Sequence, residues 1–317
     1  MKILLTGAFG IVGREVLDTL IRRGYEVRIF EIKNFNNWTT SLGYVKNAEI
    51  FWGDIRKEED VKNALKDIGI VIHLAAIIPP LADKNPDLAY SVNFGGTMNL
   101  INSMEDQTTK PKLIYTSSIA IYGDRRDDPY IKKTDKPNPN SNDHYAKQKS
   151  QCEIEIKKSN LEWAIFRLTY IVSPRKLKMD PIMFEMPLDT SIEVCTAKDT
   201  ALALVNAIEC EEIWGNIYHI AGGKKCRTSY KEYLIRMFQI FGIDFKNFPD
   251  EAFAKKDFHC GFLDTEESQR LLHYQKHTLE DYYQNVEEEI GILYYFYKLT
   301  KNIAQKHLLH QSKYLDE

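Results

Sequence analysis

Three residues of this chain have the types and spacing needed for proton transfer at an oxygen atom: Ser118, Tyr145 and Lys149. Tyr145 and Lys149 are four residues apart, so on a helix they share one face. A free tyrosine has a pKa of about 10, and a nearby lysine ammonium is expected to lower that pKa toward neutrality. Ser118 would hold the reacting oxygen beside the tyrosine. Because a Tyr-x-x-x-Lys pair is common by chance, its meaning depends on the elements around it.

A glycine-rich turn near the N-terminus is the first of these elements. Residues 2–6 predict a buried strand, and Gly7, Gly10 and Gly13 follow it at the spacing of a phosphate-binding turn. Gly7 allows the tight turn, Gly10 lets the backbone approach a pyrophosphate, and Gly13 lets the next helix pack closely. That helix, predicted at 11–23, would offer unpaired N–H groups and the positive end of its dipole to phosphates.

An acidic residue lies where a bound dinucleotide would need one. Residues 26–31 predict a second strand that ends in Glu31. A carboxylate at this position accepts hydrogen bonds from the adenosine ribose and repels a 2′-phosphate, which favours NAD over NADP. The nearby Lys33 weakens that preference. The glycine turn, Glu31 and the Ser118, Tyr145 and Lys149 set together predict a nicotinamide-binding domain that performs hydride transfer.

The pattern along the chain predicts an α/β fold, a Rossmann-type doubly wound parallel sheet followed by a smaller, mostly helical C-terminal lobe. A polar loop at 124–143 ends directly before Tyr145 and is expected to border the site. The predicted strands are 2–6, 26–31, 49–52, 69–74, 112–117 and 163–168, and the predicted helices are 11–23, 58–67, 86–104 and 143–158.

Beyond residue 170 the alternation becomes irregular, which indicates a second lobe. We expect an NAD-binding domain made of 1–170 plus 195–220 and a substrate-binding lobe made of 171–194 plus 221–317. The further elements predicted are a helix at 200–210, a strand at 216–220, a helix at 229–241 and one long terminal helix from 279 to about 307.

These motifs in combination resemble the extended short-chain dehydrogenases/reductases of the NAD-dependent epimerase/dehydratase family, from residue 1 to about 225. The matching segments are Thr6–Gly13, Gly53–Asp54, His73–Ala76, Asn93 with Gly96–Thr97, the set of Ser118, Tyr145 and Lys149, and the single residues Arg167 and Asp199.

The resemblance implies roles for individual residues. Ser118, Tyr145 and Lys149 would be catalytic, with Lys149 also bound to the nicotinamide ribose. NAD contacts are implied for Gly7, Phe9, Gly10, Ile11, Gly13, Glu31, Asp54, Ile55, Leu74, Ala75, Ala76, Asn93, Thr116, Tyr145 and Lys149. Substrate contacts are implied for Ile78, Ser118, Ile119 and Tyr170.

Departures from the family pattern narrow the activity. Family dehydratases carry an acid one or two positions after the residue that matches Ser118, where this chain has Ile119 and Ala120, so a dehydratase is disfavoured. The predicted function is an NAD-dependent epimerase or dehydrogenase acting at a secondary alcohol of a sugar or nucleotide sugar. Two alternatives stay open: an NAD(P)-dependent reductase of a small non-nucleotide carbonyl substrate, and a non-catalytic NAD(H)-sensing interaction protein.

Composition excludes several other classes of protein. The 317 residues carry a net charge of −3, which gives no reason to expect nucleic acid or a membrane as partner. Five scattered cysteines without a C-x-x-C pair predict reduced thiols and a cytoplasmic location. No metal is expected, because the histidine pairs lack a third ligand. Tyr283, Val286 and Ile290 begin an apolar helical stripe that would pack on its own lobe or form a homodimer seam.

Overall fold

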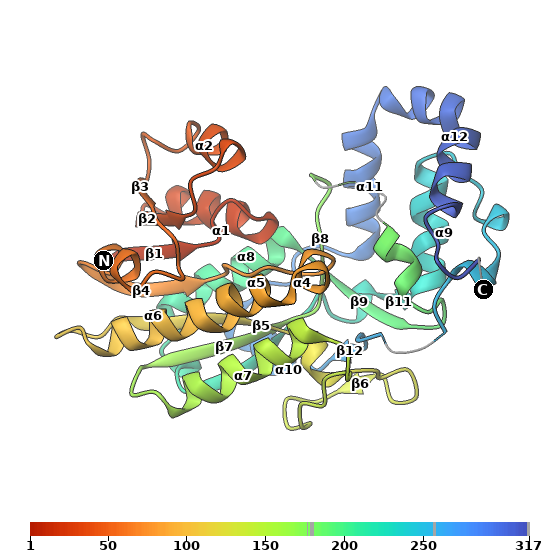
Figure 1. The fold of residues 1–317 in the computed structure, drawn as a ribbon. Helices are drawn as coiled ribbons and strands as arrows, with labels where there is room; N and C mark the ends of the chain where they lie inside the picture. The colour runs from red at the N-terminus through yellow and green to blue at the C-terminus, as the bar shows by residue number, and fades with distance from the viewer. Residues whose placement is uncertain (176, 178–180, 256–257, 316–317) are drawn as a thin grey trace.

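The computed structural model describes residues 1–175, 177, 181–255 and 258–315, which form two connected lobes (Figure 1). The larger lobe is built on a seven-stranded parallel sheet with the strand order β3-β2-β1-β4-β5-β7-β10. Its strands are β1 Lys2–Thr6, β2 Glu26–Glu31, β3 Glu49–Trp52, β4 Ile68–His73, β5 Lys112–Ser118, β7 Trp163–Leu168 and β10 Asn216–Ile220. The predicted Rossmann-type doubly wound sheet is confirmed. Chain order reverses between β1 and β4, the place where such sheets bind ligands.

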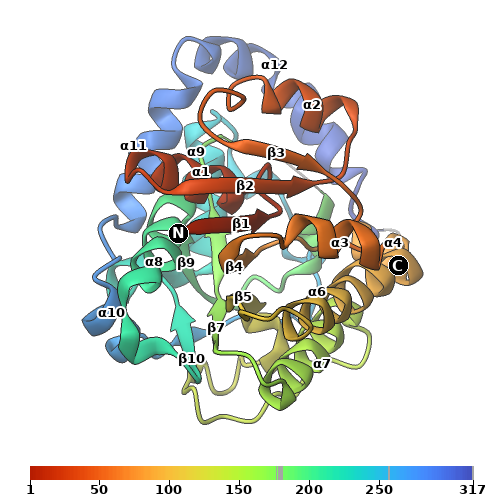
Figure 2. The same ribbon diagram turned by 90° about the vertical axis from the view of Figure 1, so that its left-hand side faces the viewer.

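Helices cover both faces of this sheet, as the end-on view in Figure 2 shows. Helices α1 and α8 pack against each other on one face, and α6 and α7 lie on the other. The helices of this lobe are α1 Ile11–Arg22, α2 Phe35–Ser41, α3 Glu58–Ala64, α4 Leu81–Lys84, α5 Pro86–Tyr90, α6 Gly96–Glu105, α7 His144–Lys158 and α8 Ala197–Asn206, with a π-helical turn at Ser91–Gly95. Since both faces are covered, the central strands are largely apolar and buried.

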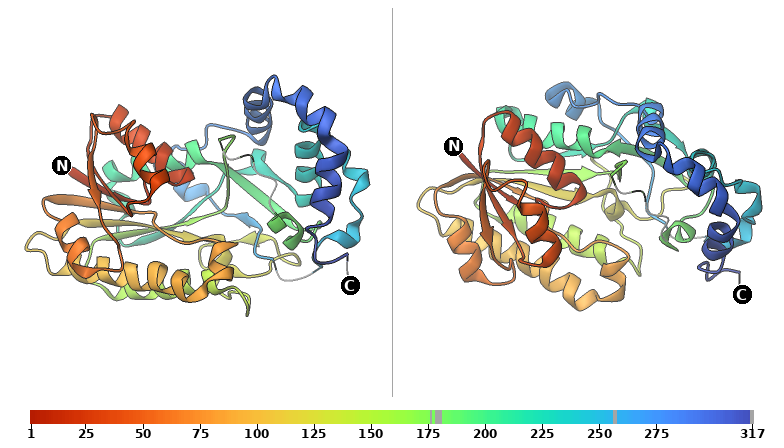
Figure 3. Two further views of the ribbon diagram at one scale, coloured as in Figure 1. Left: turned by 45° about the horizontal axis from the view of Figure 1, so that its top comes forward. Right: turned by 90° about the horizontal axis from the view of Figure 1, so that it is seen from above.

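The smaller lobe combines a second sheet with helices (Figure 3). Strands β8, β9 and β11 form its three-stranded sheet, in which β9 pairs in parallel with β8 and antiparallel with β11. A separate two-stranded sheet joins β6 to β12. The elements are β6 Tyr130–Ile131, β8 Tyr170–Val172, β9 Ser191–Thr196, β11 Arg227–Ser229, β12 Phe262–Leu263, α9 Tyr230–Ile240, α11 Leu279–Ile290 and α12 Leu293–Leu309. Helix α10 Glu266–Leu272 returns to the larger lobe, where it packs against β10 and α8.

The single terminal helix expected from 279 to about 307 is wrong, because two helices occupy that segment. Gly291 adopts a positive φ of 45° after Ile290 and ends α11, and α12 then starts in a new direction (Figure 1). The apolar residues Tyr283, Val286 and Ile290 are buried in the core of their own lobe. This first part of the apolar stripe is therefore used inside the lobe, whereas Leu293 at the start of α12 is 55% exposed.

Other predicted boundaries shift for local reasons. The helix predicted at 86–104 contains the π-helical turn, and the helix predicted at 58–67 ends at Ala64, shortly before Asp67 takes a positive φ of 62°. Helix α2 was not predicted. Asn34 caps it by accepting a hydrogen bond from the Asn37 backbone N–H. This capping signal did not lead to a predicted helix, because the helix is short and has polar residues on its inner side.

One buried ion pair ties α7 to the sheet. Arg167 in β7 donates to both carboxylate oxygens of Glu153 in α7, at 3.0 and 2.7 Å, and both side chains are almost fully buried. Arg167 also donates to the hydroxyl of Tyr122. Since a buried charge without its partner is costly, this pair fixes where α7 lies on the sheet.

Replacing Glu153 by Leu is expected to lower the free energy of unfolding by about 3–5 kcal/mol, because Arg167 would stay buried and unpaired. The double variant Glu153→Leu/Arg167→Met should recover most of this loss. Urea denaturation measures both. Glu155→Ala, which removes a more exposed partner of Lys158, is the control and should change stability by less than ~1 kcal/mol. If Glu153→Leu and Glu155→Ala lowered the free energy of unfolding by the same amount, the buried pair would not stabilise the fold more than the exposed pair does.

Candidate active site

The predicted site residues converge on the carboxyl edge of the parallel sheet. The glycine turn follows β1, Glu31 ends β2, Asp54 follows β3, and residues 74–76 follow β4. Ser118 ends β5, and Tyr145 and Lys149 project from the first turns of α7, which packs beside β5. Parallel strands bring residues far apart in sequence to the same edge, and this edge is where ligands of doubly wound sheets bind.

Lys149 is the best-anchored member of the Ser118, Tyr145 and Lys149 set. Its side chain is buried, and Nζ donates a hydrogen bond of 2.7 Å to the backbone oxygen of Thr116. Nζ also lies 4.7 Å from the Tyr115 ring centroid and 5.8 Å from that of Tyr145. Burial lowers the pKa of Lys149 to about 8, so the ammonium form still predominates at neutral pH.

The phenol of Tyr145 has a pKa above its ordinary value. Burial is the main cause, the negative charge of Asp143 adds to it, and a hydrogen-bonding interaction with the Ser118 side chain opposes it. The expected lowering by Lys149 does not prevail, because desolvation of the phenolate outweighs the nearby positive charge. Tyr145 is therefore a protonated acid at neutral pH, with Ser118 beside it.

Helix α7 starts at a polar anchor that joins the two lobes. Asp143 caps the helix by accepting from the Ala146 backbone N–H at 2.8 Å. Its other carboxylate oxygen lies 2.7 Å from Nδ1 of His259, which belongs to the C-terminal segment. Neither residue was predicted as part of the site. An aspartate before a helix is a recognisable capping signal, whereas nothing local marks His259.

A buried chain of hydrogen bonds connects the glycine turn to α6. The hydroxyl of Thr6 lies 2.7 Å from Nδ1 of His73, and it accepts from the Ala75 N–H at 3.2 Å. On the other side of the ring, Nε2 lies 3.0 Å from the hydroxyl of Thr97, which donates to the Asn93 oxygen. Because the Thr97 proton is used on Asn93, we assign the neutral His73 tautomer that carries its proton on Nε2.

The chain of hydrogen bonds continues through Asn93 to α7, the helix that carries Tyr145 and Lys149. Its side-chain amide bonds both backbone groups of Ile77, at 2.7 and 2.9 Å, and donates to Oε1 of Gln148 at 2.7 Å. Gln148 directly precedes Lys149 and was not predicted as a site residue. Asn93 lies within the π-helical turn, a distortion that frequently occurs at functional sites. Asn93 therefore positions α7 relative to the loop after β4.

The glycine turn has the geometry expected for close backbone approach. Gly7 has a positive φ of 70°, and a Cβ atom there would lie 2.7 Å from the Ala75 nitrogen. A Cβ on Gly13 would lie 2.0 Å from the Gly7 oxygen. At Gly10 the added Cβ would meet only that same oxygen, at 3.3 Å, and would otherwise point into open space. Gly10 is the N-cap residue of α1 and has no side chain to accept hydrogen bonds from the first N–H groups of the helix. The first turn of α1 contains no acidic residue.

Glu31 turns toward this glycine turn. Its carboxylate accepts from the Phe9 backbone N–H at 3.1 Å and from the side-chain amide of Asn37 at 3.3 Å. Burial raises the pKa of Glu31, and the Phe9 hydrogen bond opposes that shift. The carboxylate is thus held beside the turn, where a ribose would be adjacent to a pyrophosphate.

Four predicted contact residues have other partners in the structure. Asp54 is held by its neighbour Arg56, whose Nη2 lies 2.5 Å from Asp54 Oδ2, and this hydrogen bond lowers the pKa of Asp54. Ile119 is buried in a small apolar cluster. Tyr170 packs on Tyr233 in the second lobe, with ring centroids 6.2 Å apart. Ile55 is buried in the sheet core and packs against α6. Of the substrate-contact set, Ile78 is exposed near the site.

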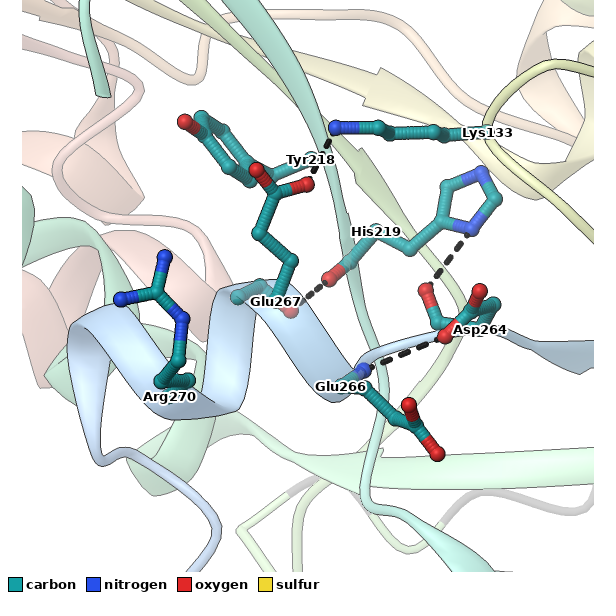
Figure 4. A pocket seen from close by; sticks show the side chains of 8 residues that line it. Lys133, Tyr218, His219, Asp264, Glu266, Glu267 and Arg270 are labelled. Atoms are coloured by element: carbon teal, nitrogen blue, oxygen red, sulfur yellow. Dashed lines mark hydrogen bonds and ion pairs between the residues drawn. The ribbon is translucent and has the colours of Figure 1, made fainter. Parts of the chain in front are cut away.

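A separate pocket of about 350 Å³ lies at the β10 side of the sheet (Figure 4). Some of its polar groups bind one another: Lys133 pairs with Glu267, and His219 Nδ1 lies 3.1 Å from the Asp264 oxygen. Among the described residues there is no cluster of three histidine, cysteine or carboxylate side chains arranged to bind a metal ion. Nor does any described helix combine the length and apolar composition of a membrane span.

Comparisons with known proteins agree with this geometry. The model of the 3-beta hydroxysteroid dehydrogenase/isomerase family matches residues 4–165, just over half of the chain. The chain is 30% identical over 197 residues to the mouse (Mus musculus) sterol-4-alpha-carboxylate 3-dehydrogenase, decarboxylating, covering 58% of this chain and 49% of that protein. It is 35% identical over 164 residues to the Escherichia coli O157:H7 N-acetyl-alpha-D-glucosaminyl-diphospho-ditrans,octacis-undecaprenol 4-epimerase, covering 51% and 43%. The chain spans about half the length of these curated relatives.

Similarity in three dimensions extends further along the chain. The fold is similar to that of the Thermus thermophilus UDP-glucose 4-epimerase solved in complex with NAD, with a TM-score of 0.72 and 21% identity. The match covers 92% of this chain and all of the other. Both lobes therefore share the architecture of that structure.

Buried His73 is expected to make stability depend on pH. Burial, and secondarily the charge of Lys149, lower its pKa to about 3 from 6.5. Between those values the unfolded chain binds a proton that the folded chain does not, so stability falls as the pH decreases from about 6.5, by up to roughly 1.4 kcal/mol per pH unit. Urea denaturation of His73→Gln between pH 7 and about 5 should show a flatter slope than wild type. The exposed His307→Gln is the control, and an unchanged slope in His73→Gln would contradict the assignment.

Proposed function

The chain belongs to the 3-beta hydroxysteroid dehydrogenase/isomerase family, within the NAD-dependent epimerase/dehydratase group of extended short-chain dehydrogenases/reductases, and on this premise we propose that it is an NAD-dependent oxidoreductase or epimerase. The reaction is hydride transfer at a secondary alcohol or the matching ketone. The observation that carries the proposal is the convergence of Ser118, Tyr145 and Lys149 at one edge of the sheet, beside the glycine turn. A purely structural role would not need a proton-transfer set at that edge.

The turn after β1 fits a dinucleotide. The open space above Gly10 and the N–H groups at the start of α1 suit a pyrophosphate, and Glu31 would accept from the adenosine ribose. A neighbour in fold was solved with NAD, which supports the same choice of cofactor. Bound NAD would supply the hydride acceptor, or NADH the donor, for the carbinol carbon. The residues proposed to hold it are the NAD-contact set named from the sequence.

Tyr145, Ser118 and Lys149 each have a separate role in the proposed proton transfer. Tyr145, kept protonated by burial, donates its proton to the oxygen of a ketone during reduction and takes it back during oxidation. Ser118 holds that oxygen next to the phenol. Lys149, fixed on the Thr116 carbonyl, places a positive charge near the site, which stabilises the phenolate after the proton has left.

The substrate is proposed to be a ring-bearing secondary alcohol. Of the relatives above, one is named for a sterol carboxylate and the other for a diphospho-linked amino sugar. We propose a sugar or nucleotide sugar first and a sterol-like or other non-nucleotide carbonyl compound second. Residues 1–170 plus 195–220 would bind the cofactor, and residues 171–194 plus 221–317 would select the substrate.

Tyr145→Phe is expected to abolish turnover, with kcat reduced by about 10²–10⁴-fold, while NAD affinity stays within about twofold of wild type. Absorbance of reduced nicotinamide measures net oxidation or reduction, and product chromatography detects epimerisation, which leaves no net change. Screening should pair each candidate sugar, nucleotide sugar and sterol with the wild type and with Tyr145→Phe. A Tyr145→Phe variant that turns over its substrate at the wild-type rate would remove the phenol from the mechanism.

Two glycine variants should separate binding from folding. Gly10→Ser is expected to fold, with stability within about 1 kcal/mol of wild type because serine caps helices well, but to bind NAD at least tenfold more weakly. Gly13→Ser should unfold at lower urea, because its Cβ would overlap the Gly7 oxygen. Calorimetric titration with NAD and urea denaturation test the pair. Unimpaired NAD binding by Gly10→Ser would contradict the proposed pyrophosphate position.

A further inference from the structure

The segment around α2 exposes an unusual stripe of large apolar side chains. Phe35 is 75% exposed, Trp38 45%, Leu42 55% and Val45 57%, and Ile32 just before the helix is 50% exposed. Within α2, Phe35 and Trp38 are three residues apart and their ring centroids lie 6.3 Å from each other, and Leu42 and Val45 follow in the turns at 42–47. Figure 1 shows α2 standing out from the body of the larger lobe.

The opposite face of the same segment is polar and points inward. Asn37 donates to Glu31 and to the Ile32 backbone oxygen, and Thr40 accepts from Arg14 at 2.8 Å. Tyr44 also lies on the inner side, where its hydroxyl donates to Asp18 at 2.9 Å. A surface helix of a soluble protein normally turns its apolar side to the core. Here several inward contacts are polar, beside the stacking of Tyr44 on Phe9, while large apolar side chains are turned to the exterior.

The charged residues within the segment itself are all of one sign, while Asp18 and Glu31 contact its inner side. Exposed lysines flank it at Lys33 and Lys46, and no aspartate or glutamate occurs between residues 32 and 48. Phenylalanine, tryptophan and leucine on one side with lysines at the edge are typical of a segment that lies in a membrane interface. Anionic lipids would complement the two lysines.

We propose that residues 32–46 form a membrane-docking surface, which inserts Phe35, Trp38, Leu42 and Val45 into the interface of an anionic lipid bilayer. This docking is peripheral and does not depend on the catalytic proposal. A second copy of the chain is the less favoured occupant. A symmetric contact through this short stripe would bring Lys33 and Lys46 of the two copies near each other, where like charges repel.

The full-length protein should be mixed with vesicles of phosphatidylcholine containing phosphatidylserine, and separately with pure phosphatidylcholine vesicles. Cosedimentation should show stronger binding to the anionic vesicles, and added salt should weaken it. The double variant Phe35→Ser/Leu42→Ser should bind about tenfold or more weakly, since it removes two inserting side chains. Lys33→Ser should weaken binding by roughly fivefold, the equivalent of about 1 kcal/mol.

Trp38 provides an independent signal. On binding, tryptophan emission should shift to the blue and be quenched by brominated lipid, and Trp38→Phe should lose most of both effects because Trp38 is the tryptophan within residues 32–46. The matched control is Ile303→Ser, which removes a 75% exposed apolar side chain from α12 and should bind vesicles as the wild type does. Unchanged thermal unfolding of the variants confirms that they are folded.

Three results would overturn the proposal. The first is wild-type protein that stays in the supernatant with both kinds of vesicle. The second is binding that Phe35→Ser/Leu42→Ser leaves intact. The third is a stable dimer of the wild type, in the absence of lipid, that this double variant converts to monomer, which would identify the stripe as an interface between copies.

Discussion

The buried hydrogen-bond chain centred on His73 is the constraint on which the site depends. It begins at Thr6 beside the glycine turn, passes through the imidazole to Thr97, and continues through Asn93 to Gln148 in α7. Every member is buried away from water, so any displacement would leave a polar group without a partner, at a cost of about 1–3 kcal/mol. These hydrogen bonds therefore fix the position of the region proposed for the cofactor relative to the region proposed for the reaction.

Burial also governs the electrostatics of the reactive groups. It raises the pKa of Tyr145, lowers the pKa of Lys149 to about 8 and keeps His73 neutral. Each shift favours the uncharged form, as desolvation requires. The two groups proposed to act in the reaction thus start as a neutral phenol and a lysine whose ammonium form predominates at neutral pH.

The packing of side chains around α2 differs from that in the rest of the larger lobe. Elsewhere apolar side chains face the sheet and fill its two cores. Around α2 several inward contacts are polar, and one of them holds Glu31, the acid proposed for the ribose. The same short segment therefore orients a cofactor-binding carboxylate on one side and presents an apolar surface on the other, so any partner of that surface would lie close to the adenosine end of the site.

Sequence alone determined the parallel sheet, the glycine turn and the shared helical face of Tyr145 and Lys149, because each depends on local periodicity or on spacing within one segment. The break at Gly291 and the contact between Asp54 and Arg56 are also local in sequence. Only the tertiary structure decided the position of Ser118 beside Tyr145, the His259 contact with Asp143 and the direction of the Tyr145 pKa. The last two depend on residues brought together from distant segments or on the depth of burial. Desolvation and long-range contacts are properties of the packed chain, and no local pattern of residues encodes them.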